Sequence, residues 1–200
     1  MFKIAVLISG TGTTLQSILR DSAADDLYEV VLVISDRGCR GLDYAKEHGI
    51  PYLVMERSSS LSDDILKSVK DLDLVVLAGF LSILEGRILK EMENKMINLH
   101  PSLLPKFGGK GMYGLRVHKA VYDSGMPISG CTVHYVNEII DGGAYILKRI
   151  IGIKSAEGPE EVMHLVSDIE KGALIDAIRL IAKEDNNDES TDQCLRQNRA

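Results

Sequence analysis

The sequence predicts an α/β fold: an open, mostly parallel twisted sheet with helices on both faces, Rossmann-like, and antiparallel strands in the C-terminal part. Apolar runs of strand length recur through the first half, and each is followed by a stretch of helical periodicity. Nearly continuous apolar strands that alternate with helices are typical of a parallel sheet covered on both faces. After residue 100 the pattern changes to a glycine-rich loop and a pair of alternating strands.

The elements can be placed in order along the chain. Strands are expected at residues 2–9, 29–35, 51–55, 72–79 and 95–100. A helix opens at about Thr13, and two more are expected over 40–49 and 60–72, where Gly49 and a serine cluster supply the end and start signals. The second half predicts a loop over 108–114, a short helix over 113–125, strands over 128–138 and 144–153, and a closing helix over 158–184.

Length and composition indicate one globular domain over residues 1–184, followed by a disordered polar tail over 185–200. The net charge of -6 argues against a general nucleic-acid or anionic-membrane surface, which would need clustered Lys and Arg. Cys39, Cys131 and Cys194 are too scattered for a disulfide framework or a zinc site. No signal peptide or membrane span is visible, so we expect a cytoplasmic protein; the oligomeric state stays open.

A glycine loop follows the first expected strand, in "VLISGTGTTLQSIL". Gly10 and Gly12 leave the backbone N–H groups of a helix start approachable, which suits a phosphate. The hydroxyls of Thr11, Thr13 and Thr14 add donors, but Leu15 stands where a dinucleotide-binding loop has its third glycine. Asp36, at the end of the second strand, keeps a dinucleotide site open as an alternative, and a merely tight turn is another.

Two hydrogen-bonding side chains end the fifth strand, in "MINLHPSLLPKF". Asn98 and His100 are two residues apart, so they project to one side, about 6.5 to 7 Å from each other. An amide donor beside an imidazole suits acyl-type transfer, since both can stabilise an oxygen that becomes negative. Asp141, on the glycine turn of "EIIDGG", could raise the pKa of His100 and orient it.

A structural role for these three residues remains an alternative: Asn98 and His100 could satisfy loop backbone groups, and Asp141 could be an ordinary turn residue. No nucleophile stands out, so direct attack by a substrate amine is favoured over a covalent intermediate. His118 and His134 are interpreted as packing or surface residues.

Several stretches together resemble the glycinamide ribonucleotide (phosphoribosylglycinamide) formyltransferases of the folate-dependent formyltransferase superfamily. They are "VLISGTGTTLQSI", "DLVVLAGFLSIL", "INLHPSLLPKF", "SGCTVHYVNEIIDGG" and "DIEKGAL", in the same order over roughly residues 1 to 183. The resemblance implies transfer of a formyl group from 10-formyltetrahydrofolate to the amine of glycinamide ribonucleotide in de novo purine (IMP) biosynthesis, without metal. Both partners are small molecules.

The resemblance also implies roles by position. Asn98 would bind the formyl oxygen, His100 would donate a proton, and Asp141 would keep His100 protonated and help order a water. The ribonucleotide phosphate and ribose would be bound by Gly10, Thr11, Gly12, Thr13, Thr14, Leu15 and Glu170. The folate would be bound by Leu81, Ser82, Ile83, Leu84, Asn98, Ile139, Ile140 and Asp141.

The chain departs from the family pattern at three places: Thr14 stands for the usual Asn, Ser82 for the Arg of some members, and "KFGGKGMYG" lacks a proline after the aromatic. Arg57 is interpreted as a surface arginine.

Three other functions are alternatives to this assignment. Methionyl-tRNA formyltransferase would need a further basic domain, and formyltetrahydrofolate hydrolase usually carries an extra N-terminal domain. A non-catalytic nucleotide-binding module would keep "SGTGTT" but would not need Asn98, His100 and Asp141 together.

Overall fold

The computed structural model describes residues 1–197, and within that range seven strands form one sheet in the order β3-β2-β1-β4-β5-β6-β7. The strands are β1 Phe2–Ile8, β2 Tyr28–Ser35, β3 Tyr52–Val54, β4 Leu74–Leu77, β5 Met96–His100, β6 Ile128–Tyr135 and β7 Tyr145–Gly152. Strands β1 to β5 pair in parallel, whereas β6 and β7 join antiparallel at one edge. The predicted α/β class, with antiparallel strands in the C-terminal part, is confirmed.

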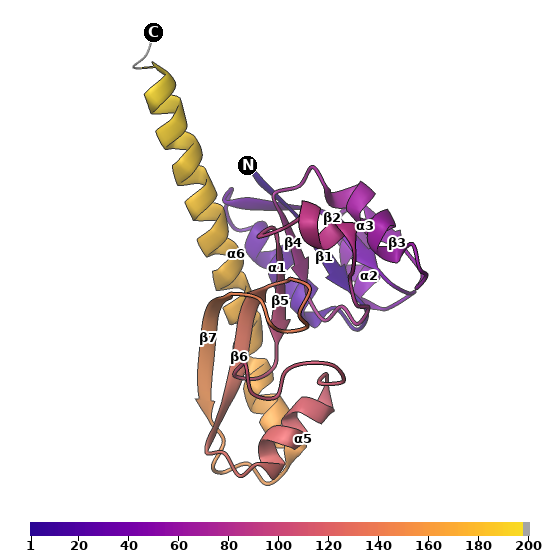
Figure 1. Cartoon of the computed structure of the whole chain (residues 1–200), viewed down its shortest axis with the longest axis vertical. Helices are drawn as coiled ribbons and strands as arrows, with labels where there is room; N and C mark the ends of the chain where they lie inside the picture. Colours follow the sequence, from indigo (N-terminus) through magenta and orange to yellow (C-terminus); the bar gives the residue numbers. More distant parts are fainter. Residues whose placement is uncertain (198–200) are drawn as a thin grey trace.

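Six helices lie around this sheet in the described part of the chain (Figure 1). They are α1 Thr13–Ser22, α2 Gly41–Glu47, α3 Leu61–Val69, α4 Arg87–Glu91, α5 Leu115–Asp123 and α6 Pro159–Gln197. Alternate residues of β1 face opposite sides of the sheet, so Ile4 packs with α1 and α6, and Leu7 packs with α3 and α4. Burial of each such side chain contributes about 1.5–3 kcal/mol.

Three elements differ from the sequence expectation. Strand β3 is a short edge strand whose side chains are exposed, because it has a neighbour on one side only. Helix α4 had not been predicted. Helix α6 continues to Gln197 and extends past the sheet (Figure 1), which corrects the expected helix end near Glu184. The domain over residues 1–184 and the disordered polar tail over 185–200 stay predictions, and the last three residues of that tail lie outside the described residues.

Loops follow β1, β2, β4 and β5 at the carboxyl ends of these strands. Because the strands are parallel, their carboxyl ends lie at the same end of the sheet, which is where α/β sheets bind ligands. The extra strand β6 runs against β5 and places Asn98 opposite His134, and His100 opposite Thr132. The antiparallel pair therefore brings the second half of the chain to the same end of the sheet.

Candidate active site

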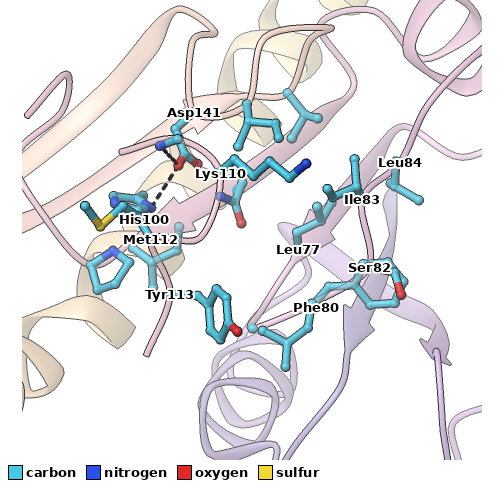
Figure 2. Close-up of a pocket in the computed structure, with 18 of the residues that line it drawn as sticks. Leu77, Phe80, Ser82, Ile83, Leu84, His100, Lys110, Met112, Tyr113 and Asp141 are labelled. Carbon is cyan, nitrogen blue, oxygen red and sulfur yellow. Dashed lines mark hydrogen bonds and ion pairs between the residues drawn. The ribbon is translucent and has the colours of Figure 1, made fainter. Parts of the chain in front are cut away.

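A cavity of about 770 Å³ opens at the carboxyl ends of β4 and β5 (Figure 2). Its walls come from the segment 79–84, the end of β5, the glycine-rich loop 109–114 and the turn 139–141. Of the residues predicted for the site, those lining this cavity are Thr14, Leu81, Ser82, Ile83, Leu84, Asn98, His100, Ile139, Ile140, Asp141 and Glu170. Segments more than 150 residues apart in sequence thus share one hollow.

His100 ends β5 with its imidazole almost fully buried. Its Nε2 lies 2.8 Å from the carbonyl oxygen of Phe107, and since a carbonyl only accepts, Nε2 carries the proton. Its Nδ1 lies 3.4 Å from Oδ2 of Asp141, the contact drawn as a dashed line in Figure 2. The predicted imidazole–carboxylate pair is therefore present in the structure.

The electrostatic balance at His100 differs from the expectation. Burial lowers the pKa of the imidazole, and the Asp141 charge and the Phe107 carbonyl raise it by less, so the pKa lies below the ordinary histidine value. Asp141 raises the pKa of His100, as expected, but burial removes almost all the hydration of the ring and lowers the pKa by more. The carboxylate limits the decrease without reversing it.

Asp141 is held in the left-handed backbone region, with φ at 57°, in the turn after β6. The Gly109 N–H donates a hydrogen bond of 2.8 Å to its Oδ2, and His134 Nε2 lies 3.6 Å from its Oδ1. Burial by itself would raise the pKa of the Asp141 carboxyl, but His134 in its protonated form, the Gly109 N–H and the charge of a protonated His100 together outweigh that effect and lower it. The carboxylate is thus ionised and aimed at His100 near neutral pH.

His134 is a site residue that the sequence analysis missed. Its Nδ1 lies 2.8 Å from the carbonyl oxygen of Tyr135, so in the neutral ring Nδ1 carries the proton and Nε2 is an acceptor. The Asn98 amide Nδ2 is 3.2 Å from that Nε2 and donates to it. The interpretation of His134 as a packing or surface residue is therefore corrected: it is buried, but it lines the cavity between Asn98 and Asp141.

His118 behaves as expected of a packing residue. It is buried on α5, and its Nδ1 has no hydrogen-bond partner within the described residues. Burial, with a smaller effect of the nearby His100, lowers the pKa of His118 to about 4, so the ring is neutral. Burial also raises the pKa of the Cys131 thiol to about 12, which makes it a poor nucleophile.

The glycine loop after β1 packs against the start of α2. Gly12 has φ at 74°, and a Cβ there would lie 2.5 Å from the Gly41 Cα. Gly41 in turn donates its N–H to the Gly10 carbonyl over 3.0 Å. The loop is thereby shaped by a close approach of two glycines, which leaves the amino end of α1 bare of side-chain caps.

The predicted phosphate residues are placed unequally around this loop. Gly10, Thr11 and Thr13 are exposed at the loop surface, and Thr14 faces the cavity. The Leu15 side chain is fully buried in the core, so only its backbone N–H is available to a ligand. Glu170, from α6, lines the same cavity as Thr14, and burial raises the pKa of its carboxyl to about 7.

The wall 81–84 is apolar apart from Ser82, as Figure 2 shows on the side away from His100 and Asp141. Ile83 and Leu81 are 60% and 49% exposed, and Ile139 on the facing turn is 68% exposed, so apolar side chains stand bare over the opening. Exposed apolar residues gathered at a cavity are typical of a ligand site for a flat, partly apolar molecule.

Of two expectations about charged residues near this wall, one is corrected and the other is extended. Asp36, the candidate ribose acid of a dinucleotide site, has its carboxylate fully buried among hydrogen-bond donors, so it cannot receive a ribose. Arg57 is a surface arginine, as interpreted, with its side chain 52% exposed, and it also lines the cavity and pairs with Asp36. Charged or bulky lining residues that were not singled out from the sequence include Arg37, Leu77, Phe80, Lys110, Met112, Tyr113 and Arg116.

Within the part of the chain that the structure describes, no group of three or more His, Cys, Asp or Glu residues is arranged to hold a metal ion. The expectation that the reaction uses no metal stays a prediction. Over the same residues, no helix has the length and apolar character needed to cross a bilayer.

Comparison with known proteins gives a consistent result. A family model described as formyl transferase matches residues 2–178. The chloroplastic phosphoribosylglycinamide formyltransferase of Arabidopsis thaliana is 35% identical over 194 residues, which cover 91% of this chain and 66% of that protein. The phosphoribosylglycinamide formyltransferase of Haemophilus influenzae is 38% identical over 172 residues, 81% of this chain and 78% of that protein.

Solved structures of similarly named proteins share the fold of this chain. The crystal structure of glycinamide ribonucleotide transformylase 1 from Symbiobacterium toebii superposes with a TM-score of 0.84 at 32% identity, over 92% of this chain and 89% of that one. This chain spans just under two thirds of the length of the Arabidopsis relative.

Proposed function

We propose that this chain, which belongs to the formyl transferase family, transfers a formyl group from 10-formyltetrahydrofolate to the amine of glycinamide ribonucleotide, a step of de novo purine biosynthesis. One observation carries the proposal: Asn98, His100 and Asp141 converge on a cavity that reaches an apolar wall and the start of α1. Relatives at 35% and 38% identity named phosphoribosylglycinamide formyltransferase support the choice of substrates.

In the proposed reaction, the substrate amine attacks the formyl carbon directly. A nitrogen–carbon bond forms and negative charge develops on the formyl oxygen. Asn98 has one amide N–H committed to His134 and a second N–H free for that oxygen. The His100 Nε2–H, which the Phe107 carbonyl accepts in this structure, is the second donor, and the formyl oxygen would replace that carbonyl.

Collapse of the tetrahedral intermediate then breaks the bond from the formyl carbon to N10 of the folate. The amine nitrogen loses one proton and N10 gains one, so the proton inventory balances. We assign the proton transfer to His100, with Asp141 as the carboxylate that supports its charged form and helps order a water. Without Asp141 the buried imidazolium would have no counter-charge.

We place the two substrates at opposite ends of the cavity. The ribonucleotide phosphate would bind at the amino end of α1, to the loop residues Gly10, Thr11, Gly12, Thr13 and Thr14 and the Leu15 N–H. Glu170 would bind the ribose hydroxyls. The pterin would lie between the wall 81–84 and the turn residues Ile139, Ile140 and Asp141, whose exposed apolar side chains support this placement.

We infer that 10-formyltetrahydrofolate serves as cosubstrate, with no metal cofactor, and that the protein acts on small molecules in the cytoplasm. The net charge of -6 supports neither a nucleic-acid surface nor binding to an anionic membrane.

The deciding measurement is release of tetrahydrofolate from 10-formyltetrahydrofolate, with and without glycinamide ribonucleotide. Release that requires the ribonucleotide supports the transferase. Release that is independent of the amine would indicate a hydrolase, and no release with either would favour a non-catalytic binding module.

The mechanism is tested with His100→Ala. Loss of one donor to a developing oxyanion typically costs about 100- to 1000-fold in rate, so turnover should fall by that order while phosphate-ligand binding survives. The matched control is His48→Ala, which removes an exposed histidine at the end of α2. Equal turnover in His100→Ala and wild type would rule out the assigned role.

A further inference from the structure

A buried carboxylate lies behind the apolar wall of the cavity. Asp36 follows β2, and its side chain has no exposed surface. The Arg37 Nε and Nη2 atoms donate to its two oxygens over 2.9 and 3.0 Å, and the Arg57 Nε donates to Oδ2 over 2.9 Å. Two cations therefore share one anion, and the cluster keeps a net positive charge.

The same carboxylate binds the wall itself. The Ser82 hydroxyl donates to Oδ2 over 2.6 Å, and Ser9, at the end of β1, also hydrogen-bonds Asp36. The Ser9 hydroxyl oxygen in turn accepts the Leu81 N–H over 2.8 Å. Two successive residues of the wall 81–84 are thus tied, one directly and one through Ser9, to a single buried charge.

The charge of Asp36 is stable in this setting. Burial alone would raise the pKa of its carboxyl, but the hydrogen bonds from Arg37, Ser82, Ser9 and Arg57 outweigh that effect and hold the pKa far below its usual range. Charge-assisted hydrogen bonds are stronger and more directional than neutral ones, so the cluster restricts where the wall and both guanidinium groups can lie.

We propose that Asp36 is a positioning residue for the cosubstrate half of the cavity: it holds the wall 81–84, Arg37 and Arg57 in the arrangement that receives 10-formyltetrahydrofolate. The inference rests on the proposed function, which places the pterin on this wall. Asp36 itself is buried and touches no reacting atom. Figure 2 shows Ser82 and Ile83 across the cavity from His100 and Asp141, so the cluster acts on binding and not on the chemical step.

Removal of the charge has a defined consequence. With a neutral amide at position 36, Ser82 loses an anionic acceptor, and two guanidinium groups lose their shared counter-ion beside the cavity. Loss of an interaction that is equally strong in the ground state and the transition state raises KM and leaves kcat unchanged. Loss of a hydrogen bond to a charged group is worth about 1.5–3 kcal/mol, or roughly 10- to 100-fold in binding.

The experiment measures kcat and KM for each substrate in Asp36→Asn, with Asp43→Asn as the control. Asp43 is an exposed carboxylate on α2 that pairs with Lys46, so it matches the change in charge outside the cavity. We expect Asp36→Asn to raise the KM for 10-formyltetrahydrofolate about 10-fold or more, with the KM for glycinamide ribonucleotide and kcat near wild type.

Ser82→Ala supplies a second measurement that keeps the charge of Asp36 and both arginines. It should raise the same KM by a smaller factor, and it decides the matter if Asp36→Asn fails to fold. An unchanged KM for the cosubstrate in Ser82→Ala would overturn the inference. It would also be overturned if Asp36→Asn lowered kcat, raised the KM of both substrates and lowered the melting temperature together. A wild-type chain with no formyl transfer would instead refute the proposed function.

Discussion

The Asn98 amide donates a hydrogen bond of 3.2 Å to His134 Nε2, and so joins the side chains of two residues that face each other across β5 and β6. The Tyr135 carbonyl keeps the proton on His134 Nδ1, which makes Nε2 an acceptor. The amide is therefore held with its nitrogen toward His134. That orientation leaves one N–H for the formyl oxygen in the proposed mechanism.

His134→Ala is expected to lower kcat about 10- to 100-fold, because a freely rotating Asn98 amide no longer presents its N–H at a constant position. Steady-state assays at saturating concentrations of both substrates measure the effect. His164→Ala, an exposed histidine of α6, is the control. A kcat equal to wild type would show that Asn98 does not depend on His134.

Gly108→Ala should displace Asp141 from His100. A Cβ at residue 108 would lie 2.4 Å from Leu104 Cδ2 and 3.2 Å from the Asp141 Cβ, so the Leu104 side chain has to turn aside and Asp141 has to give by a few tenths of an ångström. A shift of about 1 Å at a catalytic group can cost about 100-fold in rate, so we expect this smaller shift to lower kcat by roughly 10-fold or less. Gly152→Ala, where a Cβ meets no atom within 4 Å, is the control. If both variants retain full kcat, Asp141 tolerates the displacement.

Gly12→Ala should weaken both the fold and ribonucleotide binding. Its φ of 74° and the 2.5 Å approach to the Gly41 backbone leave no room for a methyl group. The left-handed conformation alone costs about 1–2 kcal/mol for a non-glycine residue, and the KM for glycinamide ribonucleotide should rise as the loop opens. Urea unfolding compares it with Gly10→Ala, where the methyl group meets no atom within 4 Å. Equal free energies of unfolding in the two variants would contradict this account.

Glu170 should make stability depend on pH. Burial raises the pKa of its carboxyl to about 7, from an ordinary value of 4.5, so the folded state binds this proton more tightly than the unfolded state. The stability it contributes is complete below pH 4.5 and is lost as the pH rises to about 7. Glu170→Gln should therefore gain stability over wild type across that window, by at most about 3 kcal/mol. Urea unfolding at pH 5 and pH 8 measures the difference, with exposed Glu47→Gln as the control.

Part of the site could be predicted from local patterns. The two-residue spacing of a strand put Asn98 and His100 on one side of β5, and the glycine signals marked the loop after β1 and the turn at Asp141. These features depend on residues close together in the chain. The length of α6 was misjudged because its polar last stretch lacks the apolar spacing that indicates a packed helix.

Other features arise only when distant segments pack together. His134 reaches Asn98 because of the register between β5 and β6, and that register depends on the turn and loop lengths of residues 101–127. Arg57 lines the cavity because its guanidinium pairs with Asp36, which lies on another loop. Burial, which sets the low pKa of His100 and the high pKa of Glu170, is likewise a property of the assembled core.

The sequence by itself therefore determined the α/β class, the strands β1 to β5, the glycine loop and the candidate trio Asn98, His100 and Asp141. Their signals are periodicity, turn chemistry and spacing, all of short range. The tertiary structure alone decided that His134 orients Asn98, that Asp36 anchors the wall 81–84, and how far burial outweighs the Asp141 charge at His100. Hydrogen bonds between distant loops and loss of hydration are consequences of packing, which a linear pattern does not contain.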